Sequence, residues 1–383
     1  MYSVAKCIFE DSQAGNQNGW LIEHDVDPYP FFANKYLHFL NVQSTSTNRE
    51  YAYKLCKFFN YLETIKQKDY VHATQEDLIS FLNYIAYGGE KILENDTFLV
   101  LGTTISLYAT VISGFYSYLY KIGASFDLSY HLKKAGSNKY SFMYGQNWND
   151  EHVQFFIDSA NKKAKKKRKH IKWYSDDQLT AVLDGMNTYR DKAVFSFTCD
   201  GMRIDEALSI ILSEYDSSKG IVVCNRSKGR ETGDTGRVVR LSNRSIQLVE
   251  EYLYNERSVV EEYQINNKII PSQYLFINLK QNASFGQPLK YRNYLQILKK
   301  AAEHAGLDPA NIRTHSGRST KAMELFRVQS NDPSSLSDQQ IADMMGWSNI
   351  SSAKPYKNAR DEETTLANWE RLNNAKENRN RNQ

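Results

Sequence analysis

A run of basic residues divides the chain. Between Asn161 and Lys172 the sequence is NKKAKKKRKHIK, in which eight of 12 residues are Lys or Arg and none is acidic. A segment with so many like charges is predicted to stay solvated. Patterns of regular structure lie on both sides of it, and 383 residues are enough for two domains with separate cores. Residues 137–172 are therefore predicted to be a linker between two domains.

The linker has more than one interpretation. It can be a plain flexible connection, or a strap that neutralises DNA phosphates and joins two domains around a duplex. In a eukaryotic protein it could also be a nuclear signal. Its position favours the strap, whose predicted DNA contacts are Lys162, Lys163, Lys165, Lys166, Lys167, Arg168 and Lys169.

The N-terminal half is predicted to be a helical domain preceded by a short extension. Residues 1–27 show signals for strands at Ser3–Phe9 and Trp20–His24 and for a turn at Gly15–Gly19. Residues 28–136 follow a helical pattern. In that domain Thr47–Glu63 has one apolar face, and the capping-box sequence TQED at residues 74–77 opens a helix that runs to residue 85.

An uncharged segment, residues 97–120, is long enough to span a bilayer. It contains many Thr, Ser and Tyr residues, however, and its apolar residues recur at steps of three and four. This spacing is typical of a helix that buries one face, which favours a buried helix of a water-soluble domain over a membrane span. The apolar residues of this stripe are Leu101, Ile105, Tyr108, Ile112, Phe115, Leu119 and Ile122.

The start of the chain and its cysteines suggest a compartment. The sequence MYSVAKCIFEDSQ has an acidic pair and no apolar core, unlike a secretory signal. The four cysteines are scattered, without CxxC or paired Cys/His spacing, which argues against a zinc site or a disulfide framework. We expect a reducing environment.

Residues 173–359 are predicted to form a mainly α domain with a small antiparallel β-sheet. The sequence SDDQ at residues 175–178 is a capping box. Two alternating segments, residues 219–225 and 237–242, predict a hairpin. Helices are predicted at Ser175–Met186, Asp191–Thr198, Asp205–Leu212, Arg244–Tyr254, Tyr291–Ala305, Arg313–Phe326 and Ser337–Met345.

Several residues of this domain are candidates for phosphate chemistry. His315 and Arg318 are three residues apart, which places both on one face of a helix. Arg203 follows a glycine just before a predicted helix, and Glu206 could orient its guanidinium from one turn away. Lys228 lies at the predicted hairpin tip. Taken singly, each of these residues is more often a surface, ion-pair or core residue.

Further candidates lie on both sides of these residues. Arg237 and Arg240 on the return strand are predicted DNA contacts. Trp347 precedes Tyr356 by nine positions, and Tyr356 could attack a phosphorus atom. Tyr356 is one of 26 tyrosines, so only its context singles it out.

Taken in order, these residues resemble the signature of the tyrosine site-specific recombinases, or phage integrase family, as encoded by transposons and phages. The matching boxes are CDGMRIDE around Arg203, SKGRETGDTGRVVRL with Lys228, HSGR from His315 to Arg318, and MGW before Tyr356. The resemblance implies a two-domain DNA clamp, with a helical, SAM-like core-binding domain and an α+β catalytic domain.

The resemblance also implies residue roles. Tyr356 would form a 3′-phosphotyrosyl link, with Arg203 and Arg318 holding the non-bridging oxygens. Lys228 would be the general acid and His315 a general base or orienting group. The indole N–H of Trp347 could donate to a phosphate oxygen. Neither ATP nor a metal is expected, because the covalent link keeps the bond energy.

The chain departs from the family pattern next to the catalytic boxes. The family usually has leucine before the second arginine and histidine after it, where this chain has Gly317 and Ser319. Pro355 directly precedes Tyr356, and proline is expected to restrict Lys354 to extended conformations. These residues affect how Tyr356 is placed.

Residues 360–383 contain Leu366, Trp369 and Leu372 at helical steps of three. In the family such a segment docks on a neighbouring protomer, and packing within the chain is the alternative. The resemblance implies double-stranded DNA with inverted-repeat core sites, a homo-tetramer on DNA (monomer or dimer when free), and accessory DNA-bending or directionality factors. A cytoplasmic, nucleoid-associated protein is expected, with at most a reduced arm-type region in residues 1–27. A type IB topoisomerase and a catalytically silent DNA-binding protein are the alternative functions.

Overall fold

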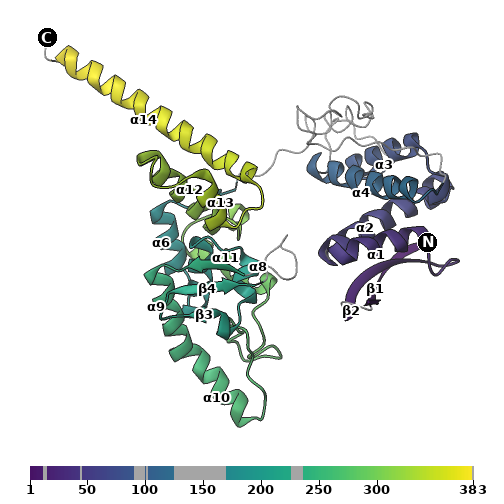
Figure 1. Cartoon of the computed structure of the whole chain (residues 1–383), viewed down its shortest axis with the longest axis horizontal. Helices are drawn as coiled ribbons and strands as arrows, with labels where there is room; N and C mark the ends of the chain where they lie inside the picture. Colours follow the sequence, from purple (N-terminus) through teal and green to yellow (C-terminus); the bar gives the residue numbers. More distant parts are fainter. Residues whose placement is uncertain are drawn as a thin grey trace. The chain divides into compact units, whose positions relative to one another are not determined.

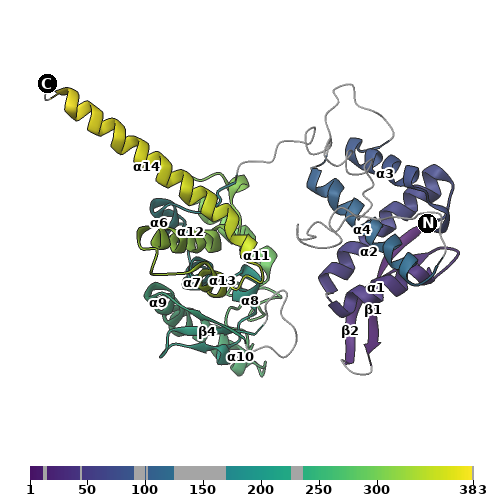
Figure 2. The same cartoon turned by 45° about the horizontal axis from the view of Figure 1, so that its top comes forward.

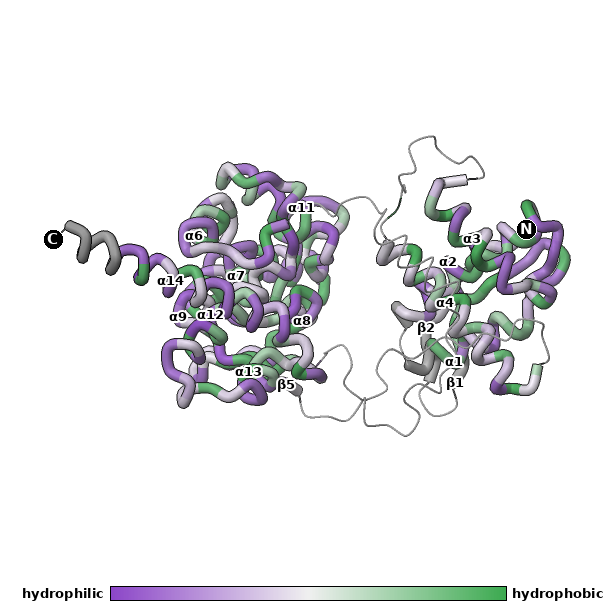
Figure 3. Tube along the Cα trace, turned by 90° about the horizontal axis from the view of Figure 1, so that it is seen from above, coloured by the Kyte–Doolittle hydropathy of each residue, from purple (hydrophilic) through white to green (hydrophobic). Residues whose placement is uncertain are grey.

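The computed structural model describes residues 1–11, 15–43, 45–89, 100, 102–124, 170–225 and 236–381. The chain divides into two compact units, Met1–Lys167 and Arg168–Gln383, and each is described by itself (Figure 1). The boundary falls within the basic run. Hydrophobic and hydrophilic residues alternate along the helices of each unit (Figure 3), as expected for helices that bury one face.

The N-terminal unit begins with a hairpin of two ten-residue strands. β1 (Tyr2–Asp11) pairs antiparallel with β2 (Gly15–His24) along its whole length. The two predicted strands are confirmed, but the turn predicted at Gly15–Gly19 is wrong. Both glycines lie in β2, where Gly19 pairs with Cys7, so these glycines extend the strand and do not end it.

The hairpin packs into the helical core, so the predicted N-terminal extension belongs to the same compact unit as the helices. Ile22 is completely buried, and its backbone N–H and C=O each bond the side chain of Asn34 at 2.8 Å. The Trp20 backbone bonds Asn48 in the same way, at 2.8 and 3.1 Å. These two amides satisfy the edge of β2, which a two-stranded sheet would otherwise leave exposed.

The helices of this unit follow the predicted pattern. The capping box between Thr74 and Asp77 is present at the start of α3, with both reciprocal hydrogen bonds. Ile105, Ile112, Phe115 and Leu119 of α4 are buried, as the stripe predicted, whereas Ile122 lies beyond the end of the helix and is exposed. The helices are α1 (Phe31–Gln43), α2 (Thr45–Tyr61), α3 (Gln75–Tyr87) and α4 (Gly102–Lys121). Among the described helices, none combines the length and apolarity that crossing a bilayer requires.

The C-terminal unit is mainly helical with one small antiparallel sheet, as predicted. The sheet has the order β3-β4-β5, with strands Tyr215–Asp216, Ile221–Cys224 and Arg237–Arg240. The first half of the unit contributes helices α6 (Asp176–Asp184), α7 (Tyr189–Cys199), α8 (Ile204–Ser209), α9 (Asn243–Glu251) and α10 (Ser258–Asn266). The second half contributes α11 (Tyr291–His304), α12 (Ser316–Asn331), α13 (Asp338–Met345) and α14 (Lys354–Arg381).

Several boundaries in this unit differ from the prediction for tertiary reasons. The third strand β3 and helix α10 were missed. A π-helical segment, Tyr252–Arg257, carries the chain from α9 directly into α10. Helix α8 ends at Ser209, before the predicted Leu212, because Ile211 forms a β-bridge with Tyr274.

The restriction expected from Pro355 is wrong. Lys354 has helical angles (φ −50°, ψ −45°), and the 3-10 turn Ile350–Ala353 leads directly into α14. Proline is tolerated here because the N–H groups of the first helical turn have no partner within the helix. Figures 1 and 2 show that the remainder of α14 projects away from the body of its unit.

Candidate active site

Three segments that are far apart in the sequence meet around one buried carboxylate. Gly201 has φ +99°, which permits the tight turn between α7 and α8 and places Arg203 just before α8. Glu206, in the first turn of α8, accepts the backbone N–H of Arg203 at 2.8 Å and is 2% exposed. The predicted pairing of Glu206 with Arg203 is confirmed, with Nη1 2.6 Å from Oε1.

Glu206 binds more than one arginine. Nη2 of Arg237 lies 2.7 Å from its Oε2, and Nη1 of Arg318 lies 3.9 Å from the same oxygen. Three guanidinium groups therefore share one carboxylate, and the cluster has an excess of positive charge. Burial would raise the pKa of Glu206, but the charge of Arg237 and the hydrogen bonds and charge of Arg203 bring it down to about 2.

The same three arginines bind the end of α13. The carbonyl oxygens of Met344–Gly346 accept, in order, from Arg237 (2.8 Å), Arg318 and Arg203 (2.9 Å). Arg318 also donates to the Gly201 carbonyl and is only 1% exposed. Burial, and then the charges of Arg203 and Arg237, lower the pKa of Arg318 to about 9.

The two arginines of β5 have different surroundings. Arg237 was predicted to contact DNA, but it is 5% exposed and faces the interior. Arg240 is exposed, as a DNA contact requires. The alternation of the strand explains the difference, since positions 237 and 239 point inward and 238 and 240 point outward.

His315 lies directly before α12 as its N-cap residue, so the helix begins three residues later than predicted. The side chain of His315 is accessible to solvent at the surface. The protein atoms around the ring still displace much of its water, and this desolvation lowers the pKa of His315. The nearby charges of Arg318 and Arg203 lower it further. Both effects favour the neutral imidazole, the form that can accept a proton.

Tyr356, in the first turn of α14, stacks on Trp347 with ring centres 5.6 Å apart and planes 15° from parallel. Phe326 of α12 is stacked on both rings. The hydroxyl of Tyr356 lies 3.0 Å from Oγ of Ser319, the residue after Arg318. At position 319 the family usually has histidine, and the serine of this chain supplies a hydroxyl partner for Tyr356.

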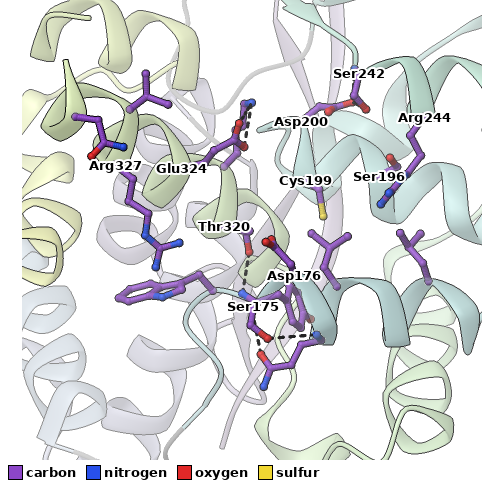
Figure 4. Close-up of a pocket in the computed structure, with 18 residues that line it drawn as sticks. Ser175, Asp176, Ser196, Cys199, Asp200, Ser242, Arg244, Thr320, Glu324 and Arg327 are labelled. Atoms are coloured by element: carbon purple, nitrogen blue, oxygen red, sulfur yellow. Dashed lines mark hydrogen bonds and ion pairs between the residues drawn. The ribbon is translucent and has the colours of Figure 1, made fainter. Parts of the chain in front are cut away.

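Trp173 was missed as a neighbour of the site. Its ring centre is 6.5 Å from that of Tyr356. Nζ of Lys172 lies over the Trp173 ring, 5.9 Å from the ring centre. Trp173 also lines a cavity of about 920 Å³ between α6, α7, α9 and α12 (Figure 4). Cys199 and Glu324 line the same cavity, whereas the arginine cluster does not. In the sequence, the only signal for Trp173 as a neighbour of Tyr356 was the aromatic pair Trp173-Tyr174 directly after the basic run.

Gly317 lies where α12 packs closely on α7. A Cβ atom at this position would lie 2.3 Å from Oγ1 of Thr198 and 3.2 Å from Sγ of Cys199. This approach requires glycine here and brings the start of α12 next to the Arg203 turn.

Lys228 and the basic residues 162–169 lie outside the described residues. Their roles stay predictions. Within the described ranges, no three His, Cys, Asp or Glu side chains are grouped so that they could hold a metal ion.

Comparison with known sequences identifies relatives over most of the chain. The sequence model of the phage integrase family matches residues 172–363, just over half of the chain. Transposase A from transposon Tn554 of Staphylococcus aureus is 23% identical over 328 residues, which cover 80% of this chain and 86% of the transposase. Tyrosine recombinase XerD of Halalkalibacterium halodurans is 24% identical over 168 residues, covering 44% of this chain and 48% of XerD.

Solved structures share the fold. The Tn1549 transposon integrase in complex with circular intermediate DNA has a TM-score of 0.55 and 13% identity, covering 87% of this chain and 97% of the integrase. The XerH site-specific recombinase bound to palindromic difH substrate has a TM-score of 0.53 and 18% identity, covering 85% of this chain and 80% of XerH. The fold is therefore that of the two-domain tyrosine recombinases. The chain belongs to the phage integrase family, and the predicted enzyme class, a tyrosine recombinase, is confirmed.

Proposed function

We propose that this protein is the site-specific recombinase of a mobile element, an integrase or transposase, which cuts and rejoins DNA through a 3′-phosphotyrosyl intermediate and a Holliday junction. One observation carries the proposal. The hydroxyl of Tyr356 is hydrogen-bonded to Ser319, next in sequence to Arg318 of the positively charged cluster. A nucleophile and a site suited to a phosphate thus lie together at one turn of α12.

The cleavage step follows from these groups. The Tyr356 oxygen attacks the phosphorus, a new O–P bond forms, and the 5′-oxygen leaves with a proton that we assign to Lys228. An ordinary tyrosine has a pKa of about 10, so its proton needs an acceptor, and neutral His315 supplies one. Arg203 and Arg318 stabilise the charge that develops on the non-bridging oxygens. The 5′-hydroxyl of another strand reverses the step, and no nucleoside triphosphate is consumed.

Arg203 and Arg318 are bound to backbone carbonyls in the structure, which supports a resting state that DNA must change. Both guanidinium groups donate to carbonyls of Met344–Gly346, and Arg318 is almost fully buried. A phosphate can compete for the same N–H groups because its charge offsets the positive excess of the cluster. DNA binding and assembly of the active site are therefore coupled.

Subunit docking through α14 is part of the proposal. Leu366, Trp369 and Leu372 are 58, 60 and 57% exposed, so none of them is buried against the described residues of the C-terminal unit. Three large apolar side chains along one helix favour a contact with another protein surface. We propose a homo-tetramer on inverted-repeat DNA sites, with accessory factors, in a cytoplasmic, nucleoid-associated protein. In this arrangement the basic run and Arg240 contact phosphates.

A covalent-capture experiment tests this function. Sheared genomic DNA of the organism that carries the gene is incubated with the full-length protein and denatured in SDS, and the protein-linked fragments are sequenced. We expect fragments that share one inverted-repeat site, and no adduct with Tyr356→Phe. Absence of adducts with the wild-type protein, or their persistence in Tyr356→Phe, would exclude the mechanism.

The same material distinguishes the two alternatives. A type IB topoisomerase would relax supercoiled plasmids that lack the captured site, and a silent DNA-binding protein would bind the site without a covalent link. The recombinases, transposase and integrase among the relatives favour the recombinase.

A further inference from the structure

Arg237 connects two parts of the candidate active site from the inside. Its Nη2 lies 2.7 Å from Oε2 of Glu206, and its Nη1 donates to the Met344 carbonyl at 2.8 Å. It therefore links the first turn of α8 to the last turn of α13. The contact with Glu206 is buried and the contact with Met344 is partly buried, and a contact shielded from water is worth more than a similar one at the surface.

Arg237 is the one arginine of this cluster to which the proposed function assigns no contact with the phosphate. The three carbonyls of Met344–Gly346 are divided among Arg237, Arg318 and Arg203. When a phosphate engages Arg203 and Arg318, these two release or share their carbonyls. Arg237 then remains as the cluster's attachment to the end of α13.

The side chain of Arg237 also packs against the turn that precedes Trp347. Gly346 has φ +59°, and a Cβ atom there would lie 2.6 Å from Cδ and 2.8 Å from Nε of Arg237. Trp347 follows immediately and stacks on Tyr356. A substitution of Arg237 is therefore expected to move Gly346 and Trp347, and through the stacked Trp347 ring also Tyr356.

A second buried arginine shows what a purely structural contact looks like in this chain. Arg257, 1% exposed, pairs through Nε with Glu261 at 2.8 Å and donates to the carbonyls of Ser272, Tyr274 and Leu275. The Nε of Arg237, in contrast, is buried without a hydrogen-bond partner among the described residues. An unpaired buried donor costs stability, so stability alone does not explain the placement of Arg237.

We propose that Arg237 is a positioning residue for strand cleavage. It holds the Met344–Gly346 turn, and with it the stacked Tyr356, while Arg203 and Arg318 exchange carbonyl oxygens for oxygens of the scissile phosphate. This inference rests on the proposed function. Arg237 touches neither the phosphate nor the nucleophile, so it acts on the rate of cleavage and not on the affinity for DNA.

The test separates these two quantities in the full-length protein. The probe is a nicked duplex with the sequence recovered by covalent capture. Single-turnover adduct formation at increasing protein concentration gives a maximal rate and a half-saturating concentration. The variants are Arg237→Gln and Arg237→Lys, with Arg257→Gln as the matched loss of a buried arginine. Circular dichroism identifies a temperature at which all are folded.

We expect Arg237→Gln to lower the maximal rate at least tenfold with half-saturation within threefold of wild type. Arg237→Lys should recover part of the rate, because lysine keeps the charge but cannot reach both partners in the same geometry. Arg257→Gln should lower the melting temperature and keep the maximal rate within twofold.

Three outcomes overturn the inference. If the half-saturating concentration rises tenfold while the maximal rate is unchanged, Arg237 is a DNA contact. If Arg257→Gln lowers the maximal rate as much as Arg237→Gln does, the effect of Arg237→Gln is one of stability. An unchanged rate in both Arg237 variants removes the role, and if Arg237→Gln does not fold, Arg237→Lys decides alone. A wild-type protein that forms no adduct counts against the proposed function and not against the role of Arg237.

Discussion

Substitution of Gly317 by alanine tests how closely the start of α12 must approach α7. A methyl group at this position would lie 2.3 Å from Oγ1 and 3.1 Å from Cβ of Thr198, and 3.2 Å from Sγ of Cys199. The Thr198 hydroxyl donates to the Phe195 carbonyl at 2.7 Å, so it cannot rotate away without losing that bond. The helix therefore has to move away from α7.

Two opposing terms set the size of the effect. Alanine is better than glycine inside a helix by about 1 kcal/mol. Overpacking of a close contact costs about 1–3 kcal/mol, and loss of the Thr198 hydrogen bond costs about 1 kcal/mol more. We expect Gly317→Ala to lower the free energy of unfolding by about 1–3 kcal/mol, or the melting temperature by roughly 2–12 °C.

Activity should fall further than stability. Helix α12 carries Arg318 and Ser319, and a shift of a few tenths of an ångström changes their contacts with the α13 carbonyls and with Tyr356. We expect the single-turnover rate of adduct formation to fall about tenfold or more at a temperature where the variant remains folded.

A double-mutant cycle with Thr198→Ala provides the control. Thr198→Ala alone loses the bond to Phe195, but in the presence of Gly317→Ala it removes the closest contact, so the two changes should couple favourably by about 1 kcal/mol. The reasoning is refuted if Gly317→Ala is as stable as wild type, or if Thr198→Ala destabilises the Gly317→Ala variant as much as it destabilises the wild-type protein.

Three further predictions concern the nucleophile, the base and subunit docking. Ser319→Ala removes the hydrogen bond to Tyr356, and we expect adduct formation to slow about fivefold in single-turnover assays while gel-shift affinity stays unchanged; a larger loss of affinity would contradict this role. Because the pKa of His315 is lowered from its ordinary 6.5, the neutral imidazole persists as pH falls through 6.5, so the cleavage rate should decline only below that pH. This acid limb should be absent in His315→Gln, and its persistence would assign it to another group. Trp369→Ser should leave the melting temperature unchanged, since the ring is 60% exposed, and should weaken assembly on DNA in sedimentation experiments; unchanged assembly would argue against docking through α14.

Local signals predicted much of the secondary structure. The capping boxes at Thr74 and Ser175 predicted two helix starts, because a cap involves only residues three positions apart. The alternation in residues 237–242 predicted β5. It could not show which face of the strand is buried, since that depends on α13 and Glu206 packing against it.

One difference from the prediction had a non-local cause and another a local one. The hairpin of residues 2–24 joins the helical core through Asn34 and Asn48, whose side chains bind the backbone of β2. These amides lie in a different part of the sequence from the strand they satisfy. Pro355 was expected to keep Lys354 extended, but the preceding 3-10 turn already directs the chain into α14.

By itself, the sequence determined the family of this protein and predicted the residues of its site, because the order Arg203, His315, Arg318, Trp347 and Tyr356 with its spacing is a property of the chain. Only the tertiary structure decided how these groups are held. The arginines bind carbonyls at the end of α13, and their burial depends on a helix packed from elsewhere in the chain. Hydrogen bonds and desolvation act over a few ångströms in space, so they follow from which segments meet and not from their order.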